Sequence, residues 1–387
     1  MYFSGYKRPD GRAGIRNHIL ILPASVCASD TTSMIASQIK GAVTFHNQNG
    51  CSQVKIDQQL TMDIMSGFAA NPNIYGTIVV SLGCENCQMD LVVEAIRERT
   101  NKPLKTFIIQ EVGGTLKTIE QAVRAGKEMV REASALQREP IDISELIVGT
   151  NCGGSDPTSG LSANPVIGAL SDRIVSLGGT SILSETTEFI GAEHILAARA
   201  KTPEVAARIY EIIYRFEEHI RVSGHEEIRE SNPTPGNIES GITTLEEKSL
   251  GCIYKGGHSE ISAVFDYAKQ VTEKGLVIMD TEGHDPSSVA AMVAGGAQIV
   301  VFSTGLGTPT GNPIAPVIKL TGNKATFEKM KDNIDFSTSG MIYNTDSLED
   351  LAEGLFNEMI EVCNGKLSKA EALGYSEIAI ARLCNFT

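Results

Sequence analysis

The chain has 387 residues, of which 42% are hydrophobic, 21% are charged and 5% are aromatic, and its formal charge is −14. A chain of this length commonly divides into two domains. The negative charge makes nonspecific attraction to nucleic acid or to an anionic membrane surface weak. The N-terminus lacks the order of a secretory signal, and no apolar run approaches the ~18–20 residues that span a bilayer. We therefore expect a cytoplasmic protein that binds neither nucleic acid nor membrane.

Eight short apolar runs recur along the chain, and a polar or Gly-rich turn follows each of them. They are HILILP (18–23), AVTF (42–45), TIVVSLG (77–83), TFIIQ (106–110), ELIVGT (145–150), TSILSE (180–185), LVIMD (276–280) and QIVVFST (298–304). Runs of this kind suit strands that are buried on both faces. A ninth run, NPIAPVIKL (312–320), reads as another strand.

Amphipathic patterns predict helices over 116–136 and 203–221, the second opening with Pro203. The alternation of strands and helices predicts an α/β fold, a parallel-sheet Rossmann-like variant in two lobes with helices on both faces. We place the boundary near residue 140, which gives lobes of 1–140 and 141–387. The polar segment 223–251 is either an interdomain linker or a loop that serves a site. We assign it to the second lobe as a loop.

Reactive side chains gather directly after the predicted strands, where ligands of open parallel sheets bind. Cys51, Cys84 and Cys152 each follow a strand and precede Gly-rich or helical sequence. Three thiolates with an open position fit an iron–sulfur cluster, and with His46 or a carboxylate added they fit a single Fe(II) or Zn(II). The sequence therefore predicts a metal site at the end of one sheet. Cys27 and Cys252 are possible neighbours of this site.

Other patterns leave alternatives open. Cys84 and Cys87 form a CxxC that could serve a thioredoxin-like redox function. The Gly-rich turns 153–160 and 303–312 offer backbone N–H groups to carboxylates or phosphates. Gly305 and Gly307 do not have the spacing of a dinucleotide fingerprint, and no P-loop is present. A basic cluster near the N-terminus, which includes Arg12 and Arg16, is either a solvated surface or a carboxylate clamp.

Many ordered motifs resemble those of the altronate and galactarate dehydratase family. The matching residues are Gly5-Tyr6, Gly11-Arg12, Arg16-Asn17, His46 with Gly50-Cys51, Gly83-Cys84-Glu85, Cys152 to Asp156, Ala163-Asn164-Pro165, Ser184-Glu185, Glu188, Thr243 to Glu246, Lys248 to Cys252, Lys255 and Phe302 to Gly305 with Gly307. The resemblance runs from residue 5 to about 385 and covers the large catalytic portion of the family. It implies an iron-dependent lyase, with Fe²⁺ or a [4Fe-4S] cluster, that converts a sugar acid into a 2-keto-3-deoxy acid.

The same family includes the large (beta) subunit of (2R)-sulfolactate sulfo-lyase, which expels sulfite. In both reactions a base takes the proton alpha to a carboxylate, the enolate is stabilised and the beta substituent leaves. The strand-end positions and the family motifs together give three sets of candidate site residues. The base candidates are His46, Lys248, Lys255 and His284. The substrate-binding candidates are Arg12, Arg16, Asn17, Ser155, Asp156, Asn164, Glu185, Glu188, Gly305 and Gly307, and the metal ligands are Cys51, Cys84 and Cys152.

The resemblance also implies partners. Sugar-acid dehydratases of this family usually carry a small β-rich domain ahead of the Gly-Tyr segment. In this sequence that segment stands at residues 5 and 6, so we expect the small β-rich part to be a separate subunit. The residues after His46 are Asn-Gln-Asn-Gly, which departs from the sugar-acid dehydratases. A homodimer of the large subunit is the default for an enzyme of this size.

A function of a different class is also open: the chain could be a metal-independent binding subunit for a small anionic hydroxy acid.

Overall fold

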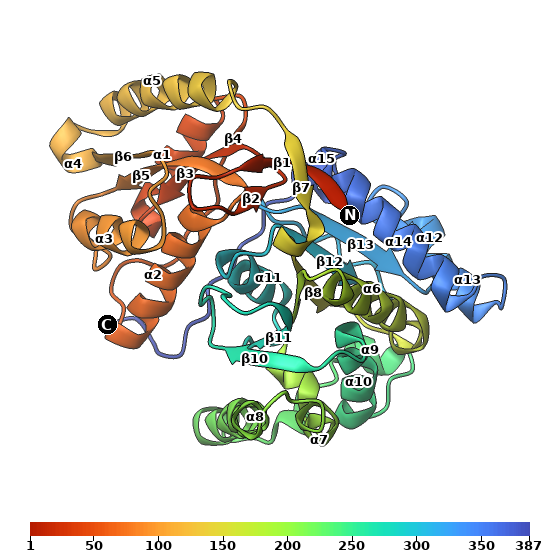
Figure 1. Ribbon diagram of the computed structural model, residues 1–387. Coiled ribbons are helices and arrows are strands. Elements are labelled where there is room, and N and C mark those ends of the chain that lie inside the picture. The colour runs from red at the N-terminus through yellow and green to blue at the C-terminus, as the bar shows by residue number, and fades with distance from the viewer.

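The computed structural model describes all 387 residues, and two parallel sheets dominate it (Figure 1). The smaller sheet has the strand order β4-β3-β5-β6. Its strands are β3 (His18–Pro23), β4 (Ala42–Val43), β5 (Ile74–Ser81) and β6 (Leu104–Ile108). Its helices are α1 (Val26–Ala36), α2 (Lys55–Ala70), α3 (Met89–Arg99), α4 (Ile109–Val112) and α5 (Thr115–Ala133). Together these elements form the small lobe.

The larger sheet has the strand order β10-β11-β9-β8-β12-β13-β14, and all its neighbours pair in parallel. Its strands are β8 (Ile147–Cys152), β9 (Thr180–Leu183), β10 (Ile261–Phe265), β11 (Gly275–Met279), β12 (Ile299–Ser303), β13 (Val317–Thr321) and β14 (Phe336–Ser337). After β8 the chain forms β9, β10 and β11 on one side of that strand, and then β12, β13 and β14 on the other side. This sheet therefore has a topological switch point beside β8, the place where open sheets bind ligands.

Ten helices belong to this large lobe. They are α6 (Asn164–Ser176), α7 (Glu193–Ala197), α8 (Pro203–Gly224), α9 (Pro235–Glu239), α10 (Leu245–Cys252), α11 (Asp285–Ala294), α12 (Lys324–Lys329), α13 (Ser339–Ile342), α14 (Leu348–Cys363) and α15 (Lys369–Leu373). A π-helical turn over Ser159–Ala163 precedes α6, and a 3₁₀ turn over Ile253–Gly256 continues α10. No helix of the protein combines the length and the apolar character that crossing a membrane needs.

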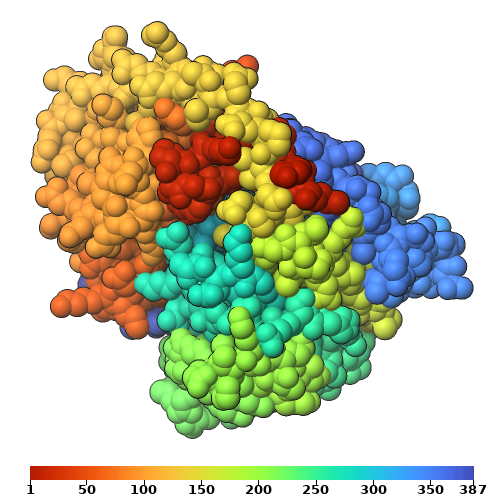
Figure 2. Space-filling model, viewed as in Figure 1, coloured from red at the N-terminus to blue at the C-terminus, as the bar shows by residue number.

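A third, antiparallel sheet joins the beginning of the chain to the connection between the lobes. It has the order β2-β1-β7 and consists of β1 (Tyr2–Lys7), β2 (Ala13–Gly14) and β7 (Glu139–Asp142). The N-terminal residues consequently lie where the two lobes meet, as the space-filling view shows (Figure 2). At the other end of the chain, the backbone N–H groups of Leu383 and Cys384 donate to the Asp57 carboxylate of α2.

The two lobes share a hydrophobic core. One cluster of 33 buried residues contains Leu20 and Phe68 of the small lobe together with Val300 and Phe302 of the large lobe. Helices α2 and α11 approach so closely that a Cβ added at Gly67 would lie 2.4 Å from the Ala294 carbonyl oxygen. Glycine at this position therefore permits the contact that holds the lobes together.

The structure confirms all nine predicted strands, with ends shifted by a few residues, and both predicted helices. The two parallel sheets occupy residues 18–108 and 147–337, on either side of the expected boundary near residue 140. Five strands were not predicted: β1, β2, β7, β10 and β14. Three of them pair antiparallel outside the main sheets, and the other two are edge strands with little continuous apolar sequence.

Two expectations are corrected. The reactive strand ends do not lie on one sheet, because the first four predicted strands pair with each other and not with the later ones. The linker interpretation of residues 223–251 is also wrong. This segment lies within the large lobe and carries α9 and most of α10, which pack against the turn after β8. There Asn237 donates to the Ser155 carbonyl oxygen at 2.9 Å.

Candidate active site

A buried cluster of thiol, amine and carboxylate groups lies at the carboxyl edge of the large sheet. Strand β8 ends at Cys152, and Glu185 follows β9, its neighbour in the sheet. The remaining members, Lys248, Cys252 and Lys255, come from α10 and the 3₁₀ turn that continues it. Their spacing of four and three residues places these three side chains on one helical face. That face is turned toward the ends of β8 and β9.

Cys152 is the centre of the cluster. Its Sγ lies 3.3 Å from Cys252 Sγ and 2.9 Å from Lys255 Nζ. A hydrogen bond from the Cys252 thiol lowers the pKa of Cys152 to about 5 against the opposing effect of burial, and the Lys255 charge acts in the same direction as that bond. Conversely, donating that bond raises the pKa of Cys252. Near neutral pH, Cys152 is therefore a thiolate and Cys252 is a thiol.

Lys255 and Glu185 form a fully buried ion pair. The Lys255 Nζ lies 2.7 Å from Glu185 Oε2, and the two side chains are 0% and 1% exposed. Burial alone would lower the pKa of Lys255, but the charges of Cys152 and Glu185 outweigh it and raise the pKa, so this lysine stays an ammonium. Burial and the Cys152 charge raise the pKa of Glu185. A buried ammonium held between a thiolate and a carboxyl group is costly to build, which is typical of functional sites.

The backbone at Glu185 is strained. Its φ of 74° lies in the left-handed region, which a residue with a Cβ rarely adopts. The conformation is held by two hydrogen bonds: the Glu185 N–H donates to Thr281 Oγ1, and the carboxylate accepts from the Cys152 N–H, each at 2.9 Å. Strain of this kind persists where the surrounding structure imposes it, and it concentrates at active sites.

A second ion pair extends the cluster. Lys248 Nζ lies 2.8 Å from Glu188 Oε1 and 2.9 Å from Asn232 Oδ1. Glu188 Oε2 in turn lies 3.6 Å from Cys252 Sγ. Although burial works against it, the charge of Glu188 raises the pKa of Lys248. Both lysines of the cluster are therefore cations rather than free bases at neutral pH.

Asp285, the first residue of α11, brings a carboxylate close to the cluster. A Cβ added at Gly153 would lie 2.0 Å from Asp285 Oδ2, so only glycine at that position leaves room for it. Asn151 Nδ2 donates to Asp285 Oδ1 at 3.4 Å. Burial and the Cys152 charge raise the pKa of Asp285 to about 7. A carboxylate with that pKa is matched to proton transfer at neutral pH.

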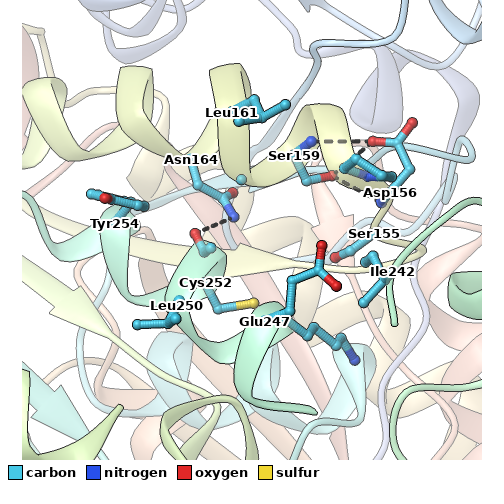
Figure 3. A pocket seen from close by; sticks show the side chains of 14 residues that line it. Ser155, Asp156, Ser159, Leu161, Asn164, Ile242, Glu247, Leu250, Cys252 and Tyr254 are labelled. Carbon is cyan, nitrogen blue, oxygen red and sulfur yellow. Dashed lines mark hydrogen bonds between the residues drawn. The ribbon is translucent and has the colours of Figure 1, made fainter. Parts of the chain in front are cut away.

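A pocket of about 240 Å³ borders the cluster at Cys252 and Lys248. The turn after β8, the π-helical turn and α10 surround it, and Figure 3 shows the Cys252 and Glu247 side chains on its α10 side. Ser155 also lines the pocket, and its Oγ is buried without a hydrogen-bond partner. A buried hydroxyl without a partner costs free energy, which a ligand or a water molecule can recover by bonding to it. The volume is smaller than the ~300–1,000 Å³ of pockets for drug-sized molecules and suits a small acid.

Asp156 and Asn164, two predicted substrate-binding residues, also line this pocket, but their side chains are engaged. Asp156 Oδ1 accepts from Thr158 Oγ1 and the Ser159 N–H, and Oδ2 accepts from Asn323. Asn164 Nδ2 donates to the Gly251 carbonyl oxygen at 2.9 Å (Figure 3). These two residues shape the pocket wall by tying the turn after β8 and α6 to their neighbours.

The residues of the predicted N-terminal clamp bind other groups inside the protein, and their contact with substrate stays a prediction. All five N–H donors of Arg16 are used inside the protein: two bind the Glu371 carboxylate, and three bind backbone carbonyl oxygens. Arg12 pairs with Asp10 and the Ala70 carbonyl oxygen. Asn17 bridges Arg8 and the Ala133 carbonyl oxygen. These residues connect the N-terminal segment to both lobes and have no side-chain contact with the cluster.

The backbone N–H groups of the predicted anion loop also have partners inside the protein. The N–H groups of Gly305 and Leu306 donate to the Gly154 carbonyl oxygen, and those of Gly307 and Thr308 donate to Thr304 Oγ1. These backbone donors are thus occupied within the protein. The loop instead supports the turn after β8, because a Cβ at Gly305 would lie 2.3 Å from the Asp156 side chain.

The three predicted thiol ligands, Cys51, Cys84 and Cys152, do not form one metal-binding group. No three His, Cys, Asp or Glu side chains form a group that could hold a metal ion. Cys51 and Cys84 lie at the edge of the small sheet, whereas Cys152 lies in the large lobe, because two sheets have two separate carboxyl edges. In this arrangement the donor set does not fit the implied iron site. Iron dependence itself stays a prediction.

Both histidine candidates lie outside the cluster. His46 is exposed in the small lobe, where its Nε2 lies 3.5 Å from Ser33 Oγ, and His284 is exposed ahead of α11. Among the predicted catalytic residues, the structure brings together Lys248 and Lys255, along with the predicted Glu185, Glu188 and Cys152. Cys252, predicted only as a possible neighbour, belongs to the same face as the two lysines. Asp285 was not among the predicted site residues, although it lies just after the predicted strand 276–280, where reactive side chains were expected.

Comparison with known proteins identifies the relatives of the chain. Residues 5–134 match the model of the D-galactarate dehydratase/altronate hydrolase second domain, and residues 143–385 match that of the D-galactarate/altronate dehydratase C-terminal domain. The (2R)-sulfolactate sulfo-lyase subunit beta of Chromohalobacter salexigens is 38% identical over 98% of this chain and 97% of its own length. The altronate dehydratases of Bacillus subtilis and Escherichia coli are 35% and 31% identical, and this chain spans 77% and 76% of their lengths.

Proposed function

The chain belongs to the D-galactarate/altronate dehydratase family, and we propose that it is a lyase acting on a small hydroxy acid, with a sugar acid of the altronate or galactarate type as substrate. The reaction removes the proton alpha to the carboxylate and expels the beta hydroxyl group, and the resulting enol becomes a 2-keto-3-deoxy acid. One observation carries the proposal: two buried ammonium groups and a carboxylate with a pKa of about 7 surround one thiolate beside a small pocket.

Asp285 is the base in this proposal. Its pKa of about 7 leaves a large unprotonated fraction at neutral pH, while the carboxyl group still binds a proton well enough to take one from carbon. Lys248 and Lys255 do not compete for this role, because their pKa values are raised and they are protonated. His46 and His284 are exposed, whereas Asp285 is partly buried beside the cluster.

The two lysines stabilise the charge that develops. Proton removal places negative charge on the substrate carboxylate as the enolate forms, and ammonium groups fixed in advance in a buried site stabilise such charge strongly. Lys248 lines the pocket directly. Lys255 holds the Cys152 thiolate and Glu185 in place at 2.9 and 2.7 Å. The Ser155 hydroxyl, which has no protein partner, is available for a substrate hydroxyl or carboxylate.

The test is direct. Protein purified without oxygen is supplied with iron, and the formation of keto acid is measured with a panel of aldonates and aldarates. We expect turnover of at least one of them, and loss of most of it in Asp285→Asn. If no member of the panel is turned over by the protein, with or without iron, the dehydratase proposal fails.

A second candidate is a sulfo-lyase subunit. The observation that favours it is the match to a beta subunit over 97% of that protein's length, whereas the altronate dehydratases extend well beyond the matched region. Sulfite would then leave in place of hydroxide, and a second, smaller subunit would complete the enzyme. Release of sulfite from sulfolactate, with no keto acid from any sugar acid, identifies this activity. Copurification of a smaller protein tests the partner.

A further inference from the structure

We propose that Cys152 and Cys252 are a site of oxidative modification, where a hydroperoxide converts the two thiols into an intrachain disulfide. Their Sγ atoms lie 3.3 Å apart although the residues are 100 positions apart in the sequence. A disulfide bond is about 2.0 Å long, so the two atoms need to approach by little more than ~1 Å. None of the other free cysteines has a thiol among its hydrogen-bond partners.

The surroundings divide the two thiols into an attacking and a resolving group. Lys255 Nζ contacts Cys152 Sγ at 2.9 Å, and a thiol beside a lysine ammonium is the more reactive of a pair toward peroxides. Cys252 Sγ lies 3.3 Å from Cys152 Sγ, with Glu188 Oε2 at 3.6 Å on its other side. A cysteine that contacts a cation and has a second cysteine within reach is the arrangement of peroxide-sensitive thiols.

The reaction balances with one equivalent of peroxide. The Cys152 thiolate attacks one peroxide oxygen, the O–O bond breaks, and the departing hydroxide takes up a proton and leaves as water. The sulfenic acid on Cys152 is then attacked by the Cys252 sulfur, the S–O bond breaks, and the hydroxide leaves with the Cys252 proton as a second water molecule. Two electrons pass from the thiol pair to the peroxide.

The pocket provides the route for the oxidant. Cys252 lines the cavity of about 240 Å³, and Gly251 beside it lies against Gly160 of the π-helical turn without an intervening side chain. In this proposal hydrogen peroxide enters the pocket, meets Cys252 in its wall and reaches Cys152 directly behind it. The other buried thiols, Cys87 and Cys363, do not line this pocket. Cys363, the last residue of α14, is packed among the apolar residues of the large lobe.

The experiment exposes the native chain to hydrogen peroxide, blocks free thiols and maps cysteines by mass spectrometry. We expect a linked pair of peptides containing Cys152 and Cys252, lighter by two hydrogens and restored by a thiol reductant. In Cys252→Ser the link is absent and Cys152 proceeds to sulfinic acid. In the matched control Cys363→Ser, which removes a buried thiol without a thiol partner, the link forms as in the unmodified chain.

Two results would overturn the proposal. One is sulfinic acid on Cys152 in the unmodified chain without any link, which means that Cys252 does not resolve the intermediate. The other is a thiol pair that stays reduced while the exposed Cys27 and Cys84 are oxidised, which means that the oxidant does not reach the site. Because the readout is a mass, both results are independent of whether the chain has the proposed lyase activity.

Discussion

The carboxyl edges of the two parallel sheets carry similar sequence features but have different surroundings. At the edge of the small sheet, Cys84 is exposed and Cys51 is partly exposed, and nearby polar groups are paired with backbone N–H groups: Glu85 accepts from Leu82 and Gly83. At the edge of the large sheet, Cys152 is buried against a lysine ammonium and a second thiol. The position of a cysteine after a strand therefore does not decide its chemistry.

The difference lies in what covers each edge. Over the large sheet, α10 and its 3₁₀ continuation place two lysines and a cysteine on the strand ends, and burial makes each charge interaction strong. No comparable helix places cations over Cys51 and Cys84. A buried charge that is paired acquires a perturbed pKa. We therefore expect the proposed reaction to take place in the large lobe.

The largest expected effect belongs to Lys255. Lys255→Met removes the ammonium that holds the Cys152 thiolate and Glu185, and we expect kcat/KM for keto-acid formation to fall about 10²–10³-fold. The matched control is Lys102→Met. Lys102 is also buried, but it bonds only the Asn71 and Ile74 carbonyl oxygens in the small lobe. That variant should lose stability and keep its activity per folded molecule. Equal losses of activity in the two variants would contradict the contrast between the lobes.

The next effect concerns the pH dependence of the reaction. Asp285 must be unprotonated to act as a base, so kcat/KM should rise with pH through about 7 and then level off. Asp285→Asn should lower kcat about 10²-fold and abolish this limb. Asp57→Asn, which alters a buried carboxylate of the small lobe that binds the C-terminal segment, should keep the limb. If the limb persists in Asp285→Asn, another group is the base.

A smaller effect tests the fit between Asp285 and the turn after β8. In Gly153→Ala the new Cβ would lie 2.0 Å from Asp285 Oδ2, so the carboxylate must move, and we expect about a tenfold loss of kcat because small displacements of a catalytic group cost this much or more. In the control Gly236→Ala the added Cβ meets nothing closer than 3.6 Å. Unchanged kinetics in Gly153→Ala would show that the position of Asp285 is not critical.

The smallest effect is expected at the small sheet. Cys51→Ser and Cys84→Ser change thiols outside the buried cluster, so we expect less than about a threefold change in kcat/KM. Iron bound by the purified protein, measured by atomic absorption, should be unchanged in both variants. Loss of iron together with activity would restore Cys51 and Cys84 as metal ligands, and the reaction would then involve both lobes.

Much of this protein could be read from local sequence. Apolar runs such as HILILP and LVIMD predict strands because burial on both faces excludes polar side chains from the strand itself. The pattern around Pro203 predicts α8 because its apolar residues recur at helical spacing. Cys152, Glu185, Glu188, Lys248 and Lys255 were also identified, from their resemblance to family motifs, and the structure places all five in one cluster.

Pairing between distant segments could not be read in this way. Whether a strand end joins the small or the large sheet depends on contacts such as β3 with β5 and β8 with β12, which are far apart in the sequence. The same holds for Arg16. Its sequence context predicted a substrate clamp, but its guanidinium group binds the carboxylate of Glu371, a residue 355 positions away. Local patterns determine which elements form, because periodicity acts over a few residues. Only the tertiary structure decided which reactive side chains share one buried site, because burial and charge pairing arise when distant elements pack.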